Sequence, residues 1–454
     1  MRILSPTSFS FFLILSLSFF KTALAELPPE PIIVAVIDSG IDINHPDLRD
    51  HIWVNSQEIP NNGIDDDYNN FTDDIVGWNF IGARNGNAEI SVEGSAATIS
   101  HQRLDLQIKA DSSALVREFN YLFGLNSRSN EQNERLVYLQ NKIQTKLRRA
   151  HNFIDEYNRD KTAFEFAADI FNLSPDQIID INSLKEFTIE TRQQELAFTF
   201  LRDSLSMGLN YEFILEELDT FQTQIDFHYN INLNQRETLV ADNPKELIEQ
   251  GYGNNDIKGP NDSHGSLVSY FLLQAAGDIP IKIMPIRAIP DGLERDKDII
   301  NAIYYAVNNG AQIINMSFGK YFSEHSKEVW EAMQFAESEG VLIVLAAGNE
   351  KLDLTQVSSY PNPVFEGLKL DNIITVGACD DVGNLTVFTN YGNLDVCAPG
   401  LNLSAPPLTD TDVSGTSFAA PQISAFSAKL VLDGYNIYEI VSILKNHHFI
   451  SLKN

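Results

Sequence analysis

A chain of 454 residues with a formal net charge of −30 is long enough for one large domain and an additional module. Its negative charge argues against nucleic acid or an anionic membrane surface as a partner, because both are themselves negatively charged. Two cysteines, Cys379 and Cys397, exclude a disulfide-rich scaffold. Both lie in apolar, strand-like runs, and the sequence leaves a disulfide and two buried free thiols equally open.

The first 25 residues have the pattern of an export signal. Arg2 precedes an apolar stretch over residues 9–20, and Ala23-Leu24-Ala25 has the small-x-small form of a cleavage site. The stretch is too short for a comfortable membrane span. We expect residues 1–25 to be a signal peptide cleaved after Ala25. The mature protein is then secreted or periplasmic, with no membrane span.

The first predicted strand of the mature chain ends in a carboxylate. Residues 31–38 form a continuous apolar run closed by Asp38, and Ser39-Gly40 turn the chain directly afterwards. Such runs suit parallel strands buried on both faces, and chemistry in open α/β sheets gathers at the carboxyl ends of strands. Asp38 is therefore a candidate functional residue, although an Asp that caps the next turn is the simpler alternative.

An acidic segment follows that strand. Asp65, Asp67 and Asn69 alternate in the way of oxygen ligands in calcium loops. The twelfth position from Asp65 is Val76 instead of Glu, which excludes an EF-hand. The segment predicts a calcium site at Asp65, Asp67 and Asn69, and a solvated acidic turn is the competing interpretation.

The composition changes over residues 82–250, where glycine becomes scarce and helical periodicity replaces that of strands. A first helical run carries apolar residues on one face, and a second extends from about Leu196 to Phe221. We expect a mostly helical module inserted into the main domain, which is formed by residues 26–81 and 251–454. The apolar positions of the first run are Leu136, Leu139, Ile143, Leu147, Ala150, Ile154 and Tyr157.

Strand-like and helix-like segments alternate after the insertion. Residues 281–286, 312–317 and 341–347 have the pattern of strands, and residues 299–308 and 328–340 that of helices. This alternation predicts an α/β fold with a doubly wound, mostly parallel sheet. His264, beside Gly265, begins a helix-like run, and Asn349 follows a strand in the same way as Asp38.

The segment from Gly415 to Pro421 reads Gly-Thr-Ser-Phe-Ala-Ala-Pro and opens an apolar helical run. Ser417 falls at the first turn of this helix, where free backbone N–H groups and the positive end of the helix dipole stabilise negative charge. That placement suits a nucleophile whose reaction develops an oxyanion. Taken alone, an ordinary N-cap serine explains the segment equally well.

Together these segments resemble the subtilisin-like serine endopeptidases (subtilases, peptidase family S8). The segments that carry the resemblance are residues 36–40, 264–266, 315–319, 346–349 and 415–421. Their order, Asp, His and then Ser, is that of subtilisin. The resemblance covers roughly residues 31–80 and 251–440, and it implies a subtilisin-like fold with a large helical insertion.

The resemblance also implies an exported enzyme that hydrolyses peptide bonds in a protein or peptide substrate. Ser417 is then the nucleophile, His264 the base and Asp38 the residue that orients His264. Asn349 and the backbone N–H of Ser417 form the oxyanion hole, with roles known from subtilisin itself. The chemistry needs no cofactor, and calcium is at most structural. The substrate pocket is expected at Ser317, Phe318 and Gly319.

Some positions depart from the family pattern. The usual family run that begins at the catalytic histidine is His-Gly-Thr-His-Val-Ala-Gly. Here Leu267 replaces the second histidine of that run and the bulky Tyr270 replaces its last glycine, which implies altered packing behind His264. This change and the insertion motivate an alternative, a catalytically silent subtilase-fold protein that binds peptides or a partner. Only residues 26–30 stand where the family usually has a folding propeptide. We therefore hypothesise that the insertion has a folding or regulatory role, or covers the cleft.

Overall fold

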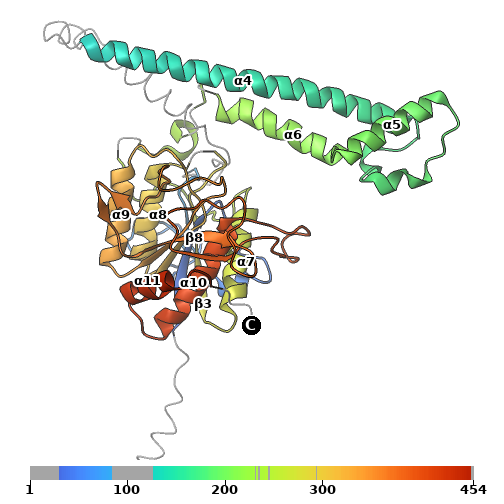
Figure 1. Ribbon diagram of the computed structural model, residues 1–454. Coiled ribbons are helices and arrows are strands. Elements are labelled where there is room, and N and C mark those ends of the chain that lie inside the picture. The colour runs from blue at the N-terminus through green and yellow to red at the C-terminus, as the bar shows by residue number, and fades with distance from the viewer. Residues whose placement is uncertain are drawn as a thin grey trace, which may run out of the picture. The chain divides into compact units, whose positions relative to one another are not determined.

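A seven-stranded parallel sheet forms the centre of the larger of two structural units in the computed structural model (Figure 1). The structure describes residues 30–83, 126–230, 232–233, 236–243, 246–292 and 294–450, with the backbone alone for residues 126–136 and 139. The sheet unit comprises Met1–Phe80, Asn255–Ala288 and Asp296–Asn454, and the helical unit comprises Ile81–Asn254 and Ile289–Arg295. The predicted signal peptide lies outside the described residues.

The sheet has the strand order β2-β3-β1-β4-β5-β8-β9. The strands are β1 (Ile32–Asp38), β2 (Trp78–Asn79), β3 (Ile281–Arg287), β4 (Ile313–Met316), β5 (Leu342–Ala346), β8 (Ile373–Cys379) and β9 (Val396–Pro399). Their carboxyl ends meet at one edge because every pair is parallel. A separate hairpin consists of β6 (Val364–Phe365) and β7 (Leu368–Lys369).

Helices cover both faces of the sheet, as the continuous apolar strands require. On one face lie α7 (Ser263–Ala276), α10 (Thr416–Leu432) and α11 (Ile437–Asn446), and on the other α8 (Asp296–Asn308) and α9 (Ser326–Ser338) (Figure 1). Val34 and Val36 of β1 belong to the core shared with α7 and α10. Ala35 and Ile37 are equally buried and alternate to the opposite face. The predicted doubly wound α/β fold is confirmed.

The helical unit contains α4 (Asn126–Asp169), α5 (Arg192–Ser206) and α6 (Tyr211–Thr223). Its short helical turns are η2 (Pro175–Gln177), η3 (Ile181–Glu186), η4 (Gln224–His228) and η5 (Arg236–Val240), and η1 (Arg49–His51) belongs to the sheet unit. Phe164, Leu201 and Ile214 are almost fully buried in the core of the helical unit. Phe153 stacks on Phe221 with ring centroids 4.6 Å apart.

The run expected from Leu196 to Phe221 is broken into two helices. Gly208 adopts a positive φ of 80°, which ends α5, and the side chain of Asn210 accepts a hydrogen bond from Phe213 N at 2.8 Å, which begins α6. Apolar periodicity continues across this break, so the hydrophobic pattern alone did not reveal it. Residues 289–295 join this unit although they lie far from it in sequence.

The two cysteines lie on neighbouring strands of the sheet. Cys379 and Cys397 form a disulfide between the neighbouring strands β8 and β9, which settles the alternative that the sequence left open. Among the residues that the structure describes, no helix combines the length and apolar character needed to cross a membrane.

Candidate active site

Asp38 is the last residue of β1 and is almost completely buried, with 2% exposure. Its Oδ1 accepts a hydrogen bond from Ser39 N at 2.7 Å, while Oδ2 has no hydrogen-bond partner among the residues that the structure describes. Gly40 follows with a φ of 136°, and a Cβ at this position would lie 2.0 Å from the carbonyl oxygen of Lys258. Only glycine therefore lets the segment around Lys258 pack against the turn that holds Asp38.

His264 lies in the first turn of α7 and faces Asp38. Its Nδ1 is 2.7 Å from Asp38 Oδ1, so the ring donates this hydrogen to the carboxylate and Nε2 is left as the acceptor. A Cβ at Gly265 would lie 2.2 Å from Gly40 O, and glycine therefore allows α7 to approach the end of β1. The side chain of His264 keeps 40% exposure.

The protonation of His264 depends on two opposing effects. Burial lowers its pKa, but the attraction of the Asp38 carboxylate and the hydrogen bond between them outweigh burial, so the pKa lies above its usual value. Asp38 thus fixes the tautomer of the imidazole and stabilises its protonated form. This pairing is what a general base needs in order to hold a proton during a reaction.

Ser417 is the second residue of α10, directly after the turn at Gly415. Its Oγ donates a hydrogen bond to Ser317 O at 3.1 Å, and Ser317 Oγ donates to Ser417 O at 2.8 Å. Asn315 Nδ2 holds Ser317 Oγ at 2.9 Å, and Ser424 Oγ of α10 donates to Asn315 Oδ1 at 2.9 Å. These contacts, of which the two at Asn315 are buried, fasten the start of α10 to the end of β4.

An aromatic contact brings the start of α10 beside His264. The ring of Phe418, the neighbour of Ser417, lies 5.7 Å from the imidazole and 5.4 Å from Phe271, measured between centroids. Phe271 in turn contacts Tyr270, so the bulky residues behind His264 form an aromatic cluster. The structure thus places the serine-bearing turn next to the paired Asp38 and His264.

Asn349 lies on the turn after β5 and is exposed. Its Oδ1 accepts hydrogen bonds from Thr416 N at 2.9 Å and from Thr416 Oγ1 at 3.0 Å. Thr416 occupies the oxygen, and a Cβ at Gly415 would be 3.5 Å from Nδ2 and 3.8 Å from Oδ1, so the amide lies against the turn at Gly415. The amide can therefore donate a hydrogen bond in front of the turn that carries Ser417.

The expected pocket residues follow β4. Ser317 is buried, Phe318 half-buried and Gly319 exposed. The next residue, Lys320, exchanges two backbone hydrogen bonds with Tyr360, at 2.9 and 2.8 Å, and its Nζ pairs with Asp296 at 2.6 Å. A cavity of about 290 Å³ lies nearby and is lined by other residues, among them Ala346, Ala347, Ser359 and Pro361.

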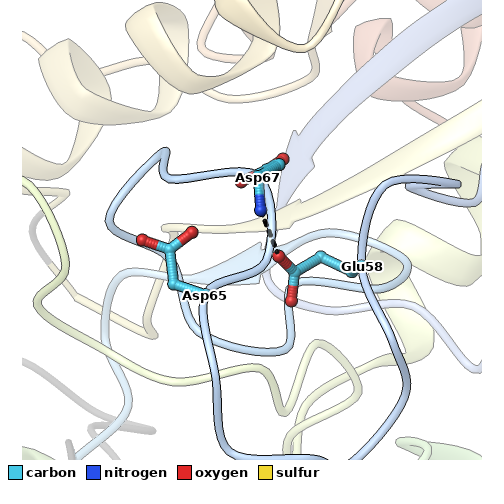
Figure 2. Close-up of side chains that lie close together, drawn as sticks. All are labelled: Glu58, Asp65 and Asp67. Carbon is cyan, nitrogen blue, oxygen red and sulfur yellow. Dashed lines mark hydrogen bonds between the residues drawn. The ribbon is translucent and has the colours of Figure 1, made fainter.

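The acidic segment forms a loop in which three carboxylates converge. Figure 2 shows Glu58, Asp65 and Asp67, each of which offers an oxygen within 4.8 Å of the others. Glu58 is buried, and its Oε1 accepts hydrogen bonds from Asp66 N at 2.7 Å and Asp67 N at 3.2 Å. Glu58 could not be predicted from the sequence because it lies outside the alternating pattern, and only the closed loop brings it to the two aspartates.

Asn69, the third predicted calcium ligand, uses its amide differently. Its Oδ1 accepts from Phe71 N at 2.7 Å, and its Nδ2 donates to Asp67 Oδ2 and to Asp74 Oδ2, both at 3.1 Å. Asp74 is completely buried, and burial raises its pKa to about 6 although Tyr305, Asn69 and Asn55 donate hydrogen bonds to it. Asp74 thus ties the loop to Tyr305 of α8, at 2.7 Å.

Comparison with known proteins shows to which family this chain belongs. Residues 30–443 match the model of the subtilase family of peptidases. The chain belongs to the subtilase family. A thermophilic serine proteinase of a Bacillus species (strain AK1) is 34% identical over 35% of this chain and 38% of its own length. Subtilisin BL of Lederbergia lenta is 29% identical over 45% of this chain and 72% of its own length.

The chain is also similar to solved structures. A cold-adapted subtilisin-like serine proteinase matches 42% of this chain and 70% of its own, at 24% identity and a TM-score of 0.35. The chain covers 38% of the length of the first curated relative, whereas the family model matches residues 30–443 of this chain.

Proposed function

We propose that this subtilase is a serine endopeptidase that hydrolyses peptide bonds of a protein or peptide substrate. The observation that carries the proposal is the hydrogen bond of 2.7 Å between Asp38 and His264, placed beside the turn that holds Ser417. A buried carboxylate that holds an imidazole next to a serine at a helix N-terminus is the arrangement that activates a nucleophile. Membership of the subtilase family supports the same chemistry.

In the proposed reaction, the Ser417 hydroxyl turns from Ser317 O to His264 when the substrate binds. His264 Nε2 accepts its proton as Ser417 Oγ attacks the carbonyl carbon, and Asp38 stabilises the imidazolium. The imidazolium then gives the proton to the leaving amine, and a water molecule hydrolyses the acyl-enzyme by the same route. Asn349 Nδ2 and the N–H of Ser417 stabilise the negative charge on the carbonyl oxygen.

Labelling with a fluorophosphonate probe tests this proposal. Purified mature protein should be labelled, a Ser417→Ala variant should not, and a Ser414→Ala variant should behave as the wild type, because the Ser414 hydroxyl bonds to the exposed Asn402 nearby. Labelled protein should also cleave a peptide library. Folded protein that resists the probe would contradict the proposal and favour a silent subtilase-fold protein that binds peptides or a partner.

We also propose that calcium binds the acidic loop as a structural ion. Carboxylate oxygens are the ligands that calcium prefers, and Glu58, Asp65 and Asp67 gather three carboxylates whose charges would repel without a cation. Backbone N–H groups already orient them, since Asn69 N and Asn70 N donate to Asp65 at 3.0 and 2.8 Å. The cation would hold the loop, and no step of the proposed hydrolysis involves it.

We also propose that the protein is exported from the cytoplasm. Residues 1–25 would direct the chain out of the cytoplasm and be removed after Ala25, and an extracytoplasmic destination agrees with the disulfide between Cys379 and Cys397. Mass spectrometry of the N-terminus of the protein recovered outside the cytoplasm tests this step. A mature chain that begins at Glu26 is expected, and an intact Met1 in that fraction would contradict it.

A further inference from the structure

Asn390 lies in the loop between β8 and β9 and is completely buried. Its side chain and backbone contact the turn that follows β5. Nδ2 donates to Ala347 O at 2.8 Å, and the backbone N–H donates to Gly348 O at 2.9 Å. Oδ1 accepts from Glu350 N at 3.2 Å and from Leu352 N at 2.8 Å. One asparagine thus satisfies four backbone groups of a single turn.

These four groups flank Asn349 on both sides in the chain. Two of them belong to the residues directly before Asn349, and two belong to Glu350 and Leu352, one and three positions after it. Gly348 has a φ of 98°, and a Cβ there would lie only 2.4 Å from Asn390 Nδ2, so the turn is shaped to receive the Asn390 amide. Asn390 therefore fixes the backbone of Asn349, whereas Thr416 fixes the orientation of its side chain.

Other polar groups complete the surroundings of Asn390 on the solvent side. Its Nδ2 lies 2.9 Å from Tyr321 Oη and 3.2 Å from Glu350 Oε2, and Tyr321 donates its hydroxyl hydrogen to Glu350. The same Glu350 oxygen accepts from Asn349 N at 2.9 Å. Asn390 is the buried centre of this network, and Tyr321 and Glu350 are its exposed rim.

We infer that Asn390 is a positioning residue for the oxyanion-stabilising amide of Asn349. The inference rests on the proposed serine endopeptidase function. Asn390 does not reach the reacting atoms. It acts by holding the turn so that Asn349 Nδ2 points at the oxygen that becomes negative in the transition state. Since that hydrogen bond forms fully only in the transition state, its loss lowers kcat and leaves KM nearly unchanged.

A matched asparagine elsewhere in the sheet unit provides the control. Asn372 is also completely buried, and its Nδ2 donates to Val341 O at 2.9 Å, at the opposite end of β5. Substituting Asn372 removes a comparable buried amide that fastens the same strand. Among the described residues, the Asn372 side chain donates to Val341 O and Met333 O, away from residues 347–352, the turn that carries Asn349 (the oxyanion turn). A general loss of stability would affect both variants, whereas a positioning effect is confined to Asn390.

The experiment measures kcat and KM on a chromogenic peptide with active enzyme counted by fluorophosphonate titration. Asn390→Ala should lower kcat up to about 10²-fold, as expected for a misplaced catalytic group. Asn390→Asp, which keeps the size and the acceptor but turns an oxygen towards Ala347 O, should also lower kcat and serves if the alanine variant does not fold. Asn372→Ala should keep kcat within about threefold of the wild type, since it leaves the catalytic geometry intact.

A double-mutant cycle separates positioning from general damage. Asn349→Ala alone should lower kcat about 10²- to 10³-fold, a magnitude known from subtilisin itself. If Asn390 acts only through Asn349, adding Asn390→Ala to Asn349→Ala should change kcat by less than about threefold, because the effects of residues that act as a unit do not add.

Equal losses from Asn390→Ala in both backgrounds, or equal losses from Asn390→Ala and Asn372→Ala, would overturn the inference while leaving the proposed function intact. Wild-type protein that neither reacts with the probe nor cleaves the peptide would overturn the proposed function, and this inference with it.

Discussion

Replacing Asp38 by Asn should change both kcat and its pH dependence. The carboxylate orients His264, which affects kcat, and it stabilises the protonated imidazole, which affects the pH dependence. The hydrogen bond spans 2.7 Å, and Coulomb's law over this distance with an effective dielectric constant of about 20 gives about 6 kcal/mol. Because the His264 side chain is 40% exposed, solvent screens part of this attraction, and the figure is an upper bound. A 10⁴-fold fall in kcat, typical for this change in Ser–His–Asp enzymes, equals about 5.5 kcal/mol.

The pH profile of kcat shows in which direction the pKa of His264 moves when the Asp38 charge is removed. Neutral His264 accepts the proton, so activity rises as pH increases through its pKa, which lies above the usual value in the wild type. Without the Asp38 charge, the burial that lowers the pKa acts unopposed. The acid limb of kcat against pH should therefore move to lower pH in Asp38→Asn, while kcat on the plateau falls about 10⁴-fold.

The assay measures kcat on a chromogenic peptide from pH 4 to 9, with Asp42→Asn as the control. Asp42 pairs with Lys258 at 2.9 Å in the same region, so its substitution removes a charge without breaking the bond to His264. An acid limb that stays in place or moves to higher pH in Asp38→Asn would refute the reasoning. So would a loss of kcat below tenfold.

Three further predictions concern contacts at the oxyanion turn and the acidic loop. Thr416→Val removes the hydroxyl that donates to Asn349 Oδ1 and accepts from Gly348 N, so kcat should fall about tenfold, the equivalent of one hydrogen bond. Thr416→Ser should restore it, and a valine variant within twofold of the wild type would contradict the role of this bond. Asp74 has a pKa raised from 3.8 to about 6, so the native state binds the proton more tightly than the unfolded state. In chelator-treated protein, the free energy of unfolding of the wild type relative to Asp74→Asn should therefore fall as pH rises from 4 to 6 and level off above, and urea titrations that give a pH-independent difference would rule this out. Calcium should raise the melting temperature of chelator-treated protein. At a calcium concentration of 100 times Kd, the free energy of unfolding should increase by about 2.7 kcal/mol. Glu58→Gln with Asp65→Asn should abolish the increase, and an unchanged wild-type melting temperature would count against the calcium proposal.

The sequence predicted the sheet unit well because its strands are continuous apolar runs and its helices alternate with them. Each such strand must be buried on both faces, which leaves a doubly wound parallel sheet as the arrangement that satisfies it. The strands ending at Asp38 and near Asn349 and Ser317 therefore had to meet at one edge. The helical unit was harder, since its apolar pattern crosses the break at Gly208 without a change in period.

Contacts between distant segments were beyond the sequence. Glu58 has no pattern that marks it as a partner of Asp65 and Asp67, and the loop must close before they meet. Asn390 sits among ordinary polar residues of a loop, and its function as proposed here depends on four backbone groups more than 35 residues away in the chain. Hydrogen bonds of this kind depend on backbone positions that no local residue pattern encodes.

The sequence by itself determined the family, the parallel sheet and which polar side chains stand at the ends of strands and helices, because hydrophobic periodicity and local motifs specify elements and their termini. Only the tertiary structure decided that Asp38 bonds to His264, that Thr416 occupies the oxygen of Asn349, and that Cys379 joins Cys397. The physical reason is that these contacts are set within tenths of an ångström by the packing of whole strands and helices, and packing is a property of the assembled core.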